Sequence, residues 1–245
     1  MLENTFIHIP SIGENKEKKL WEYGIKTWED YLSRFAHLQH HAAPCKIINE
    51  SIEAVSKKNG EFFGKMLPSN QAWRAVKKFD KICYVDIETT GLGRGDDYTT
   101  VIGLYDGSSV KSYIHGKNIN EFLEEISKYQ TVVTFNGTLF DLPFIKREFQ
   151  NVQLPPIHVD LRFVLASLEI KGGLKKIEEK FGLEREDDLK GLNGYDAVLL
   201  WRKYKKDNDE AALDKLVRYN AADIENLKFL LNYSYQEKCK RLGFE

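Results

Sequence analysis

The sequence predicts an α/β fold in which a mixed sheet is flanked by helices and preceded by a small all-α domain. A short apolar run at 81–87 suits a strand that is buried on both faces of a sheet. Later in the chain, apolar residues recur at helical spacing. The expected elements of the main domain are strands at 81–87, 100–105, 111–114 and 131–135, and helices at 119–128 and 213–231. Three strands, a helix and another strand indicate an α/β domain.

Length and composition bound the architecture. With 245 residues, the chain has room for a small helical domain at 1–75 and a larger domain at 76–245. The net charge is −1, so a polyanion has to be met by local patches of charge. Three scattered cysteines, no long apolar run and no signal-like N-terminus favour a cytoplasmic protein that has no membrane partner. Nothing in the sequence points to a particular protein partner.

Two acidic residues, Asp86 and Glu88, stand at the end of the first expected strand. Successive side chains of a strand point to opposite faces, so these two point the same way. They precede a Thr-Thr-Gly turn at the carboxyl end of the strand, where open α/β sheets usually place ligands. An acid in such an apolar strand is costly unless it is paired or bound to a metal. The alternative is that both acids are simply solvated.

Two further acids lie later in the chain. Asp141 follows the expected strand 131–135 near the start of a short helix, and Asp223 lies in helix 213–231. Tyr219 precedes Asp223 by one helical turn, so both side chains project from one face. Taken alone, Asp141 is also explained as a helix cap. Tyr219 and Asp223, taken alone, are also explained as ordinary residues of a helix without a functional role. A nuclease that uses two divalent cations needs several carboxylates at one point, because hard cations take oxygen ligands.

Together, these segments resemble the DEDD group of 3′–5′ exonucleases, which have an RNase H-like fold. Residues 86–92 resemble the first motif of the group. Residues 135–144 resemble the second motif, particularly as found in the proofreading domains of B-family DNA polymerases. Residues 219–223 resemble the third motif in its tyrosine form, since the histidine form would place histidine where Arg218 stands. The chain is also similar to the YprB-type RNase H-like domain over residues 73–230.

The resemblance implies a metal-dependent 3′–5′ exonuclease that releases nucleoside monophosphates from the 3′ end of nucleic acid. Its cofactors would be two divalent cations, Mg²⁺ or Mn²⁺. Asp86 would bridge both cations, and Glu88 and Asp223 would complete the first site. Asp141 would hold the second cation, largely through water. Tyr219 would orient the attacking water.

The same resemblance indicates where the substrate would lie. Thr90 and Leu92, just past the first acidic pair, would contact the terminal sugar and base. Phe140 would stack on the terminal nucleotide, and Asn136 belongs to the same expected substrate-binding set. Single-stranded DNA is the favoured substrate. An exoribonuclease of the same chemistry is the alternative, as is a non-catalytic nucleic-acid-binding module, although four acids converging without metal would repel one another.

The segment 9–27 resembles a helix-hairpin-helix element. In such an element, the turn at Ile12 and Gly13 presents backbone amides at a helix start to a nucleic-acid phosphate. Lys16 and two further lysines beside the turn favour this interpretation. Ser11 stands where the family more often has glycine, which adopts a positive φ without strain. The alternative is a helical adaptor that uses the hairpin for packing.

Asp160 is a fifth candidate carboxylate. It follows a short apolar strand and precedes a helix that begins near Leu161. We interpret it as the cap of that helix, with a place beside the metals as the alternative. The following stretch, 173–206, is expected to be helical and carries many lysines and arginines, which on a surface helix usually serve solvation.

Overall fold

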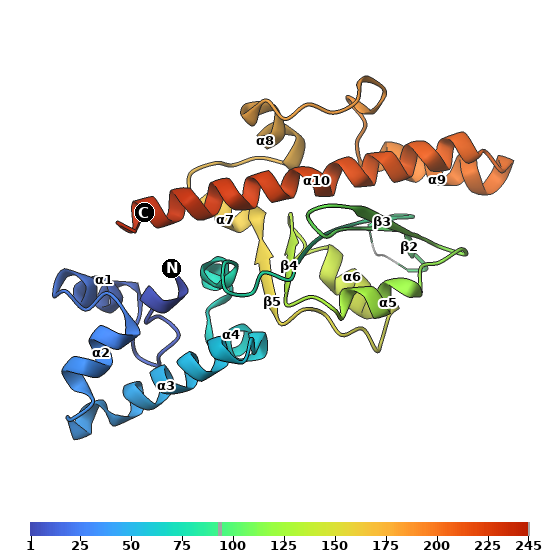
Figure 1. Cartoon of the computed structure of the whole chain (residues 1–245). Helices are drawn as coiled ribbons and strands as arrows, with labels where there is room; N and C mark the ends of the chain where they lie inside the picture. The colour runs from blue at the N-terminus through green and yellow to red at the C-terminus, as the bar shows by residue number, and fades with distance from the viewer. Residues whose placement is uncertain (93–94, 245) are drawn as a thin grey trace.

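A five-stranded sheet forms the centre of the larger domain (Figure 1). The computed structural model describes residues 1–92 and 95–244. The strands are β1 (Ile82–Thr89), β2 (Thr99–Tyr105), β3 (Val110–Ile114), β4 (Thr131–Thr134) and β5 (Ile157–Asp160), in the order β3-β2-β1-β4-β5. The pairs β1–β2 and β2–β3 are antiparallel, while β1–β4 and β4–β5 are parallel. The predicted mixed sheet is therefore confirmed.

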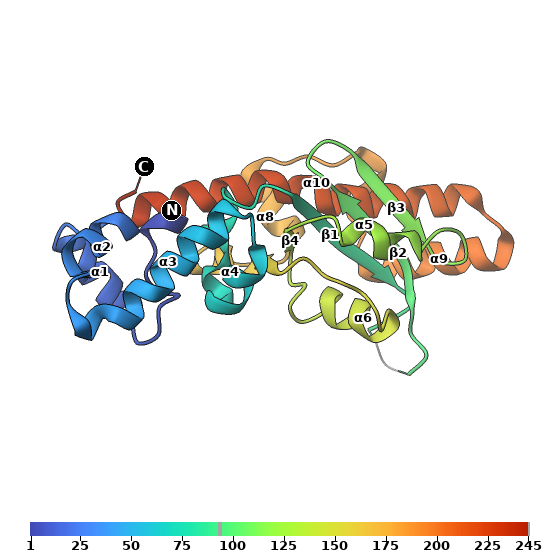
Figure 2. The same ribbon diagram turned by 60° about the horizontal axis from the view of Figure 1, so that its bottom comes forward.

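Helices cover both faces of this sheet (Figures 1 and 2). On one face lie α5 (Glu121–Ile126) and α6 (Asp141–Glu148), and on the other lie α7 (Leu161–Ser167), α8 (Leu174–Phe181), α9 (Gly194–Asp207) and α10 (Glu210–Arg241). The stretch expected to be helical at 173–206 is two α-helices, with the short η4 (Asp187–Leu189) in the segment between them. Among the helices of the described ranges, none has the length and apolar character needed to cross a bilayer.

The alternation of side chains along β1 decides where its acids point. Cys83, Val85 and Ile87 pack into the core between the sheet and the helices α5 and α6. Tyr84 belongs to the other core, which includes residues of α10. Because alternate side chains share a face, Asp86 and Glu88 lie on the same side as Tyr84. The strand therefore directs both carboxylates towards α10.

The N-terminal helices form one end of the molecule (Figures 1 and 2). Their bounds are η1 (Leu2–Asn4), α1 (Glu14–Glu22), α2 (Trp28–Phe35), η2 (Gln39–His41), α3 (Ala42–Ser56), α4 (Gly60–Met66) and η3 (Ser69–Ala75). Phe6 and Trp28 from this end share one continuous hydrophobic cluster with Val159 of β5 and Leu230 of α10. The domain boundary near residue 75 stays a prediction.

A buried ion pair fastens α1 to η3. The guanidinium of Arg74 donates to both carboxylate oxygens of Glu17 at 2.9 Å, and the two side chains are only 2% and 1% exposed. Glu17 also accepts hydrogen bonds from the backbone amides of Phe6 and Ile7. Breaking a buried pair on one side leaves an uncompensated charge, which is strongly destabilising. The position of α1 relative to the larger domain is therefore set by charge as well as by apolar packing.

The turn before α1 contains a residue with a positive φ, although serine rather than glycine stands there. Ser11 adopts a φ of 68°, in the region that favours glycine. Its carbonyl accepts a hydrogen bond from Lys16 Nζ at 2.9 Å, which ties the turn to the first helical turn. On the other side of this turn, Gln71 donates to Glu14 at 2.9 Å. These contacts pack the turn against η3, and binding of phosphate there stays a prediction.

Candidate active site

Three carboxylates from two elements meet beside the end of β1. Asp86 and Glu88 come from the strand and Asp223 comes from α10. One carboxylate oxygen from each residue lies within 4.8 Å of the others. Glu88 and Asp223 are each 7% exposed, so the cluster is largely removed from solvent. Residues 137 positions apart in the sequence thus share one site, as the motif spacing predicted.

A glycine and an asparagine position Asp86. Asp86 lies opposite Gly103 in the β1–β2 ladder. A Cβ atom at Gly103 would lie 2.1 Å from Oδ1 of Asn220, so only glycine leaves room for the asparagine side chain. Asn220 Nδ2 donates to Oδ2 of Asp86 at 3.0 Å and to its carbonyl at 3.2 Å. The amide thereby joins α10 to the strand and fixes the orientation of the carboxylate.

Asp141 reaches the same strand from the first position of α6. β4 pairs with β1 only as far as Tyr84, so the later part of β1 extends beyond this neighbour. The amide of Ile87 donates to Asp141 Oδ1 at 3.1 Å. The side chain of Asp141 is 2% exposed and lies outside the group of three closest carboxylates. The structure therefore places it beside the backbone between Asp86 and Glu88, as a helix residue whose carboxylate satisfies a strand amide.

Tyr219 lies one turn before Asp223 on α10 and is buried. Its hydroxyl oxygen accepts a hydrogen bond from Lys175 Nζ at 2.8 Å, and the ammonium lies 4.5 Å from the centre of the tyrosine ring. Arg185 donates to Asp223 Oδ1 at 2.5 Å. The tyrosine and the last aspartate therefore each have a cationic partner that comes from the region of α8.

Burial and mutual repulsion disfavour ionisation of the four acids. Burial raises the pKa of Asp86 and of Glu88 well above their usual values, and the neighbouring carboxylates raise both further. Burial raises the pKa of Asp141 to about 7, although the amide of Ile87 opposes the shift. The pKa of Asp223 is raised by burial and held back by Arg185. Ionising all four groups at neutral pH therefore has a cost that a cation would relieve.

The donor set fits a hard divalent cation. Asp86, Glu88 and Asp223 offer only oxygen atoms, which Mg²⁺ and Mn²⁺ prefer over nitrogen or sulfur. Their spacing allows one ion to contact all three, since each contributes an oxygen within the 4.8 Å group. Burial raises the pKa of Asp86 and of Glu88 even though Lys175 and Arg185 lower that of Glu88, so a bound cation would favour their ionised forms. These residues are therefore suitable ligands for a divalent metal.

A comparison with known protein families found one family model that matches more than half of the chain. Residues 83–235 match the model of the RNase_H superfamily. The chain belongs to the RNase H superfamily. This match covers β2 to β5 and all of β1 except Ile82, and it contains each of the four acids and Tyr219. A search of curated proteins found no match.

Solved structures with a similar arrangement share little sequence with this superfamily member. The family B DNA polymerase from Pyrobaculum calidifontis is 17% identical, with a TM-score of 0.46 over 64% of this chain and 24% of the polymerase. Brucella melitensis NrnC bound to pGG is 19% identical, with a TM-score of 0.46 over 66% of this chain and 75% of NrnC. Escherichia coli RNase D is 17% identical, with a TM-score of 0.42 over 71% of this chain and 47% of RNase D. The chain thus spans about a quarter of the polymerase.

Asp160 shapes the loop that leads to Asp141 in this RNase H superfamily domain. It caps α7 by accepting from the amide of Arg162 at 3.1 Å. The same carboxylate accepts from the amides of Asn136 at 2.8 Å and Thr138 at 3.0 Å. Asn136 adopts a φ of 71°, and its side chain accepts from Arg162. The capping role expected for Asp160 is confirmed, and it extends to the loop that carries Asn136.

The expected substrate-contacting residues have different exposures. Leu92 is 80% exposed and Phe140 is half-buried. Leu139, beside Phe140, is 64% exposed. The hydroxyl of Thr90 donates to Asp97 at 3.1 Å and accepts from the amide of Tyr98 at 3.1 Å, so it stabilises the turn after β1. Contact of these residues with a substrate stays a prediction.

Sequence reasoning missed the cationic residues of the site. The lysines of 173–206 indicate a solvated surface helix, whereas the ammonium of Lys175 lies beside Tyr219. Arg185 is not part of the predicted site, although it is the single basic residue in the acidic run 184–188. Asn220 enters the prediction only as part of the motif 219–223. A lone cation inside an acidic run is a signal that could have suggested an internal partner for Arg185.

We expect the metal-free protein to lose stability as the pH rises from about 4 to about 7. A carboxyl with a raised pKa keeps its proton in the folded state after the unfolded chain has lost it, so folding becomes less favourable across this range. For Asp141, whose pKa rises from 3.8 to about 7, the range is bounded by these two values. One such group contributes a slope of up to about 1.4 kcal/mol per pH unit. Urea unfolding in EDTA at a series of pH values measures the slope.

Asp141→Asn should make this pH dependence shallower, because the amide does not ionise and the other acids lose a repulsive neighbour. Asp207→Asn is the matched control, since Asp207 is exposed on α9. It should leave the slope unchanged. Equal slopes in the wild type and Asp141→Asn would contradict the electrostatic description of the site.

Proposed function

We propose that this protein is a metal-dependent 3′–5′ exonuclease that hydrolyses phosphodiester bonds and releases nucleoside monophosphates. The favoured substrate is single-stranded DNA. One observation carries the proposal: β1, α6 and α10 bring four acids together at one end of a strand, with Tyr219 one helical turn before the last of them. A carboxylate cluster of this kind suits phosphoryl chemistry that is assisted by divalent cations.

The ligand roles follow from the positions of the acids. Asp86, Glu88 and Asp223 would hold one cation, because their oxygens form the close group. Asp86 would also contact a second cation, on the side where Asp141 lies against the amide of Ile87. When bound, Mg²⁺ or Mn²⁺ lowers the pKa of a bound water and stabilises negative charge on the phosphate. The protein contributes fixed ligands, since Asn220 and Ile87 orient two of the four carboxylates.

Tyr219 is suited to orient the water that attacks the phosphate. Its hydroxyl lies among the acids, where its pKa is raised by burial and by Asp223 and Glu88. The phenol therefore stays protonated at neutral pH and can donate a hydrogen bond. Because Lys175 donates to the same oxygen, the phenol oxygen is held in place. Tyr219 is thus a positioned hydrogen-bond donor rather than an additional negative ligand.

The exposed residues around the site suit the end of a single strand. Leu92 and Leu139 offer apolar side chains, and Phe140 offers an aromatic ring that lies next to Asp141. Bases stack on aromatic side chains with little dependence on sequence. Seating of the terminal nucleotide on Leu92, Thr90 and Phe140 would bring its phosphate to the carboxylates. Asn136 would contribute through its loop, which Asp160 holds by accepting from the amide of Asn136.

The decisive test is cleavage of 5′-labelled oligonucleotides in Mg²⁺ or Mn²⁺. We expect the wild type to shorten single-stranded DNA stepwise from its 3′ end and to be inactive in excess EDTA. Asp86→Ala should abolish cleavage, because Asp86 would contact both cations. Without metal, this variant should be at least as stable as the wild type, since it loses a repelled carboxylate. Asp187→Ala, at an exposed carboxylate, is the matched control and should retain activity.

The same assay distinguishes the alternatives. Faster degradation of RNA than of DNA would replace the DNA preference with an exoribonuclease. Binding of the oligonucleotide without any cleavage would favour a non-catalytic module. Undiminished cleavage by Asp86→Ala, or full activity in EDTA, would refute the assignment of the site.

Tyr219→Phe should slow turnover on the order of 10²-fold, because one positioned hydrogen bond in a water-excluded site is lost. The ring and its packing remain, so the KM for the oligonucleotide should change little. Calorimetric titration with Mn²⁺ should give nearly the wild-type affinity, since the phenol is no ligand. Single-turnover cleavage beside this titration separates the two effects. Wild-type turnover in the variant would show that Tyr219 has only a packing role.

The N-terminal helices are proposed to add affinity for the nucleic-acid backbone through the turn at Ile12 and Gly13. Lys16, Lys18 and Lys19 are exposed on α1 beside this turn. Replacing all three with Gln should weaken binding and flatten its dependence on salt, by about 0.7 in the logarithmic slope for each phosphate contact that is lost. Point variants are preferred to truncation because removal of α1 would leave Arg74 without Glu17.

A salt series of fluorescence anisotropy with single-stranded DNA, using an inactive Asp86→Ala background, measures this slope. Lys57→Gln with Lys65→Gln is the matched control, because these exposed lysines lie at the end of α3 and on α4, and pair with Glu53 and Glu61. An unchanged slope after the α1 substitutions would leave packing as the purpose of the hairpin.

A further inference from the structure

Asp223 has a built-in cationic partner. Nη2 of Arg185 lies 2.5 Å from Asp223 Oδ1, and the two side chains are 7% and 10% exposed. The arginine belongs to the segment between α8 and α9, whereas Asp223 belongs to α10. The contact therefore joins one of the expected metal ligands to a separate part of the chain.

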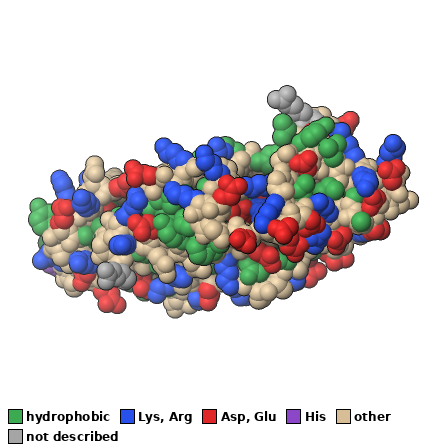
Figure 3. All heavy atoms as spheres, turned by 90° about the horizontal axis from the view of Figure 1, so that it is seen from above, with side chains coloured by type: hydrophobic (Ala, Val, Ile, Leu, Met, Phe, Trp, Pro, Cys, Tyr) green, Lys and Arg blue, Asp and Glu red, His purple; other side chains and the backbone are tan. Residues whose placement is uncertain are grey.

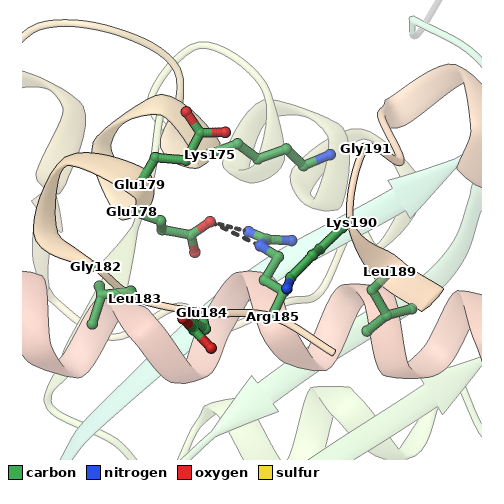
Figure 4. Close-up of a pocket in the computed structure, with 10 residues that line it drawn as sticks. All are labelled: Lys175, Glu178, Glu179, Gly182, Leu183, Glu184, Arg185, Leu189, Lys190 and Gly191. Atoms are coloured by element: carbon green, nitrogen blue, oxygen red, sulfur yellow. Dashed lines mark hydrogen bonds and ion pairs between the residues drawn. The ribbon is translucent and has the colours of Figure 1, made fainter. Parts of the chain in front are cut away.

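The position of Arg185 is set by a second carboxylate. Its Nε and Nη2 atoms donate to Oε2 of Glu178 at 2.8 and 2.5 Å (Figure 4). Glu178 is 2% exposed and also accepts from Nδ2 of Asn226 at 3.0 Å. Asn226 lies one turn after Asp223 on α10. The guanidinium is thus held between Glu178 and Asp223, and within the described residues its Nη1 atom has no hydrogen-bond partner.

A residue of α10 also binds the segment that carries Arg185. Arg218 of α10 donates to Asp188 at 2.7 Å and also pairs with Glu186. Acidic side chains gather on the face of the molecule seen in Figure 3, which is the face that α8 covers in Figure 1. Arg185 of the segment pairs with Asp223 of α10, and Arg218 of α10 pairs with Asp188 of the segment, so the segment is held against α10 by both ion pairs.

The cavity beside Arg185 has a volume of about 390 Å³. Three cations and three carboxylates line it: Lys175, Arg185, Lys190, Glu178, Glu179 and Glu184 (Figure 4). Their formal charges cancel, so the cavity offers no net attraction for a phosphate. The role of Arg185 is therefore to be sought in its contact with Asp223.

This contact limits how Asp223 can bind a cation. Because Oδ1 is engaged by the guanidinium, Asp223 would have to bind a cation mainly through its other oxygen. Mg²⁺ requires near-ideal octahedral geometry and short bonds, which single carboxylate oxygens satisfy. Ca²⁺ takes 6–8 oxygen ligands and frequently binds a carboxylate through both of its oxygens. A carboxylate restricted to one oxygen therefore suits the smaller ion better.

We propose that Arg185 is a positioning residue that restricts Asp223 to one ligand oxygen and thereby makes the site select Mg²⁺ or Mn²⁺ over Ca²⁺. Glu178 and Asn226 serve this selection by anchoring the guanidinium. The inference rests on the proposed function, because it requires a divalent cation at Asp86, Glu88 and Asp223.

The test is calorimetric titration of the full chain with Mn²⁺ and with Ca²⁺, expressed as the ratio of the two Kd values. Both ions carry the same charge, so a change in local charge alters both affinities and largely cancels in the ratio. The main variant is Arg185→Met with Glu178→Gln, which removes the guanidinium and neutralises Glu178, so that Asp223 is the one carboxylate that loses its partner. We expect the ratio of the Ca²⁺ Kd to the Mn²⁺ Kd to fall by about tenfold, the size of effect typical of residues that support metal ligands.

Two further variants keep the outcome decisive. Arg185→Lys retains the charge but lacks the planar fork that joins two carboxylates, so it should lower the same ratio even where the double variant does not fold. Lys228→Met removes an exposed charge on α10 from a residue that donates to the carbonyl of Gly107 and not to the segment of Arg185, so it should leave the ratio unchanged. An unaltered ratio in the Arg185 variants, or an equal fall in Lys228→Met, would overturn the inference. Failure of the wild type to bind Mn²⁺ would instead contradict the proposed function.

Discussion

The removal of four neighbouring carboxylates from solvent is the constraint on which the rest of the structure depends. Asp86, Glu88, Asp141 and Asp223 all have raised pKa values because burial disfavours their charged forms, and for the first three the neighbouring acids raise the pKa further. A fold that brings such groups together has to hold them by other means. Here, the sheet has apolar cores on both faces, so the positions of the acids on β1 follow from the packing of the strand and need no favourable contact among the acids themselves. The local cost is tolerated because the scaffold is stable elsewhere, which is typical of functional sites.

α10 connects this site to the N-terminal helices. Its first half carries Tyr219 and Asp223, and its second half places Leu230 and Leu231 in the core that also contains Phe6 and Trp28 of the N-terminal end. One rigid helix of 32 residues thus runs from the carboxylates to the smaller domain. The buried pair of Glu17 and Arg74 adds a directional contact to this apolar interface. The N-terminal helices and the sheet with its helices therefore share a core, so the binding and catalytic roles proposed for them do not imply that the two parts move independently.

The sequence predicted the sheet and the four acids because both leave local signals. An apolar run interrupted by Asp86 and Glu88, and a tyrosine one turn before Asp223, are visible within a few residues. The partners of these acids leave no such signal. Arg185 meets Asp223 across 38 positions, and Asn220 fits over β2 only because Gly103 has no Cβ. The hydrogen bond from Lys16 to the carbonyl of Ser11 also leaves no signal in the sequence, since it depends on the folded turn. Long-range contacts of this kind appear only when the elements are packed.

The four acids differ in how far neighbouring cations offset their charge, so the two sides of the site are electrostatically different. Asp223 faces Arg185 and lies near Lys175, and both cations lower its pKa against the effect of burial. Asp86 and Asp141 accept only neutral donors, the amide of Asn220 and the backbone of Ile87. A neutral donor offsets less of the cost of a buried charge than a cation does. When the acids are ionised, the negative charge that no cation offsets therefore lies on the side of Asp86 and Asp141, away from the segment that carries Arg185. Divalent cations bound to these acids would be inequivalent, because one position borders a fixed guanidinium and the other does not.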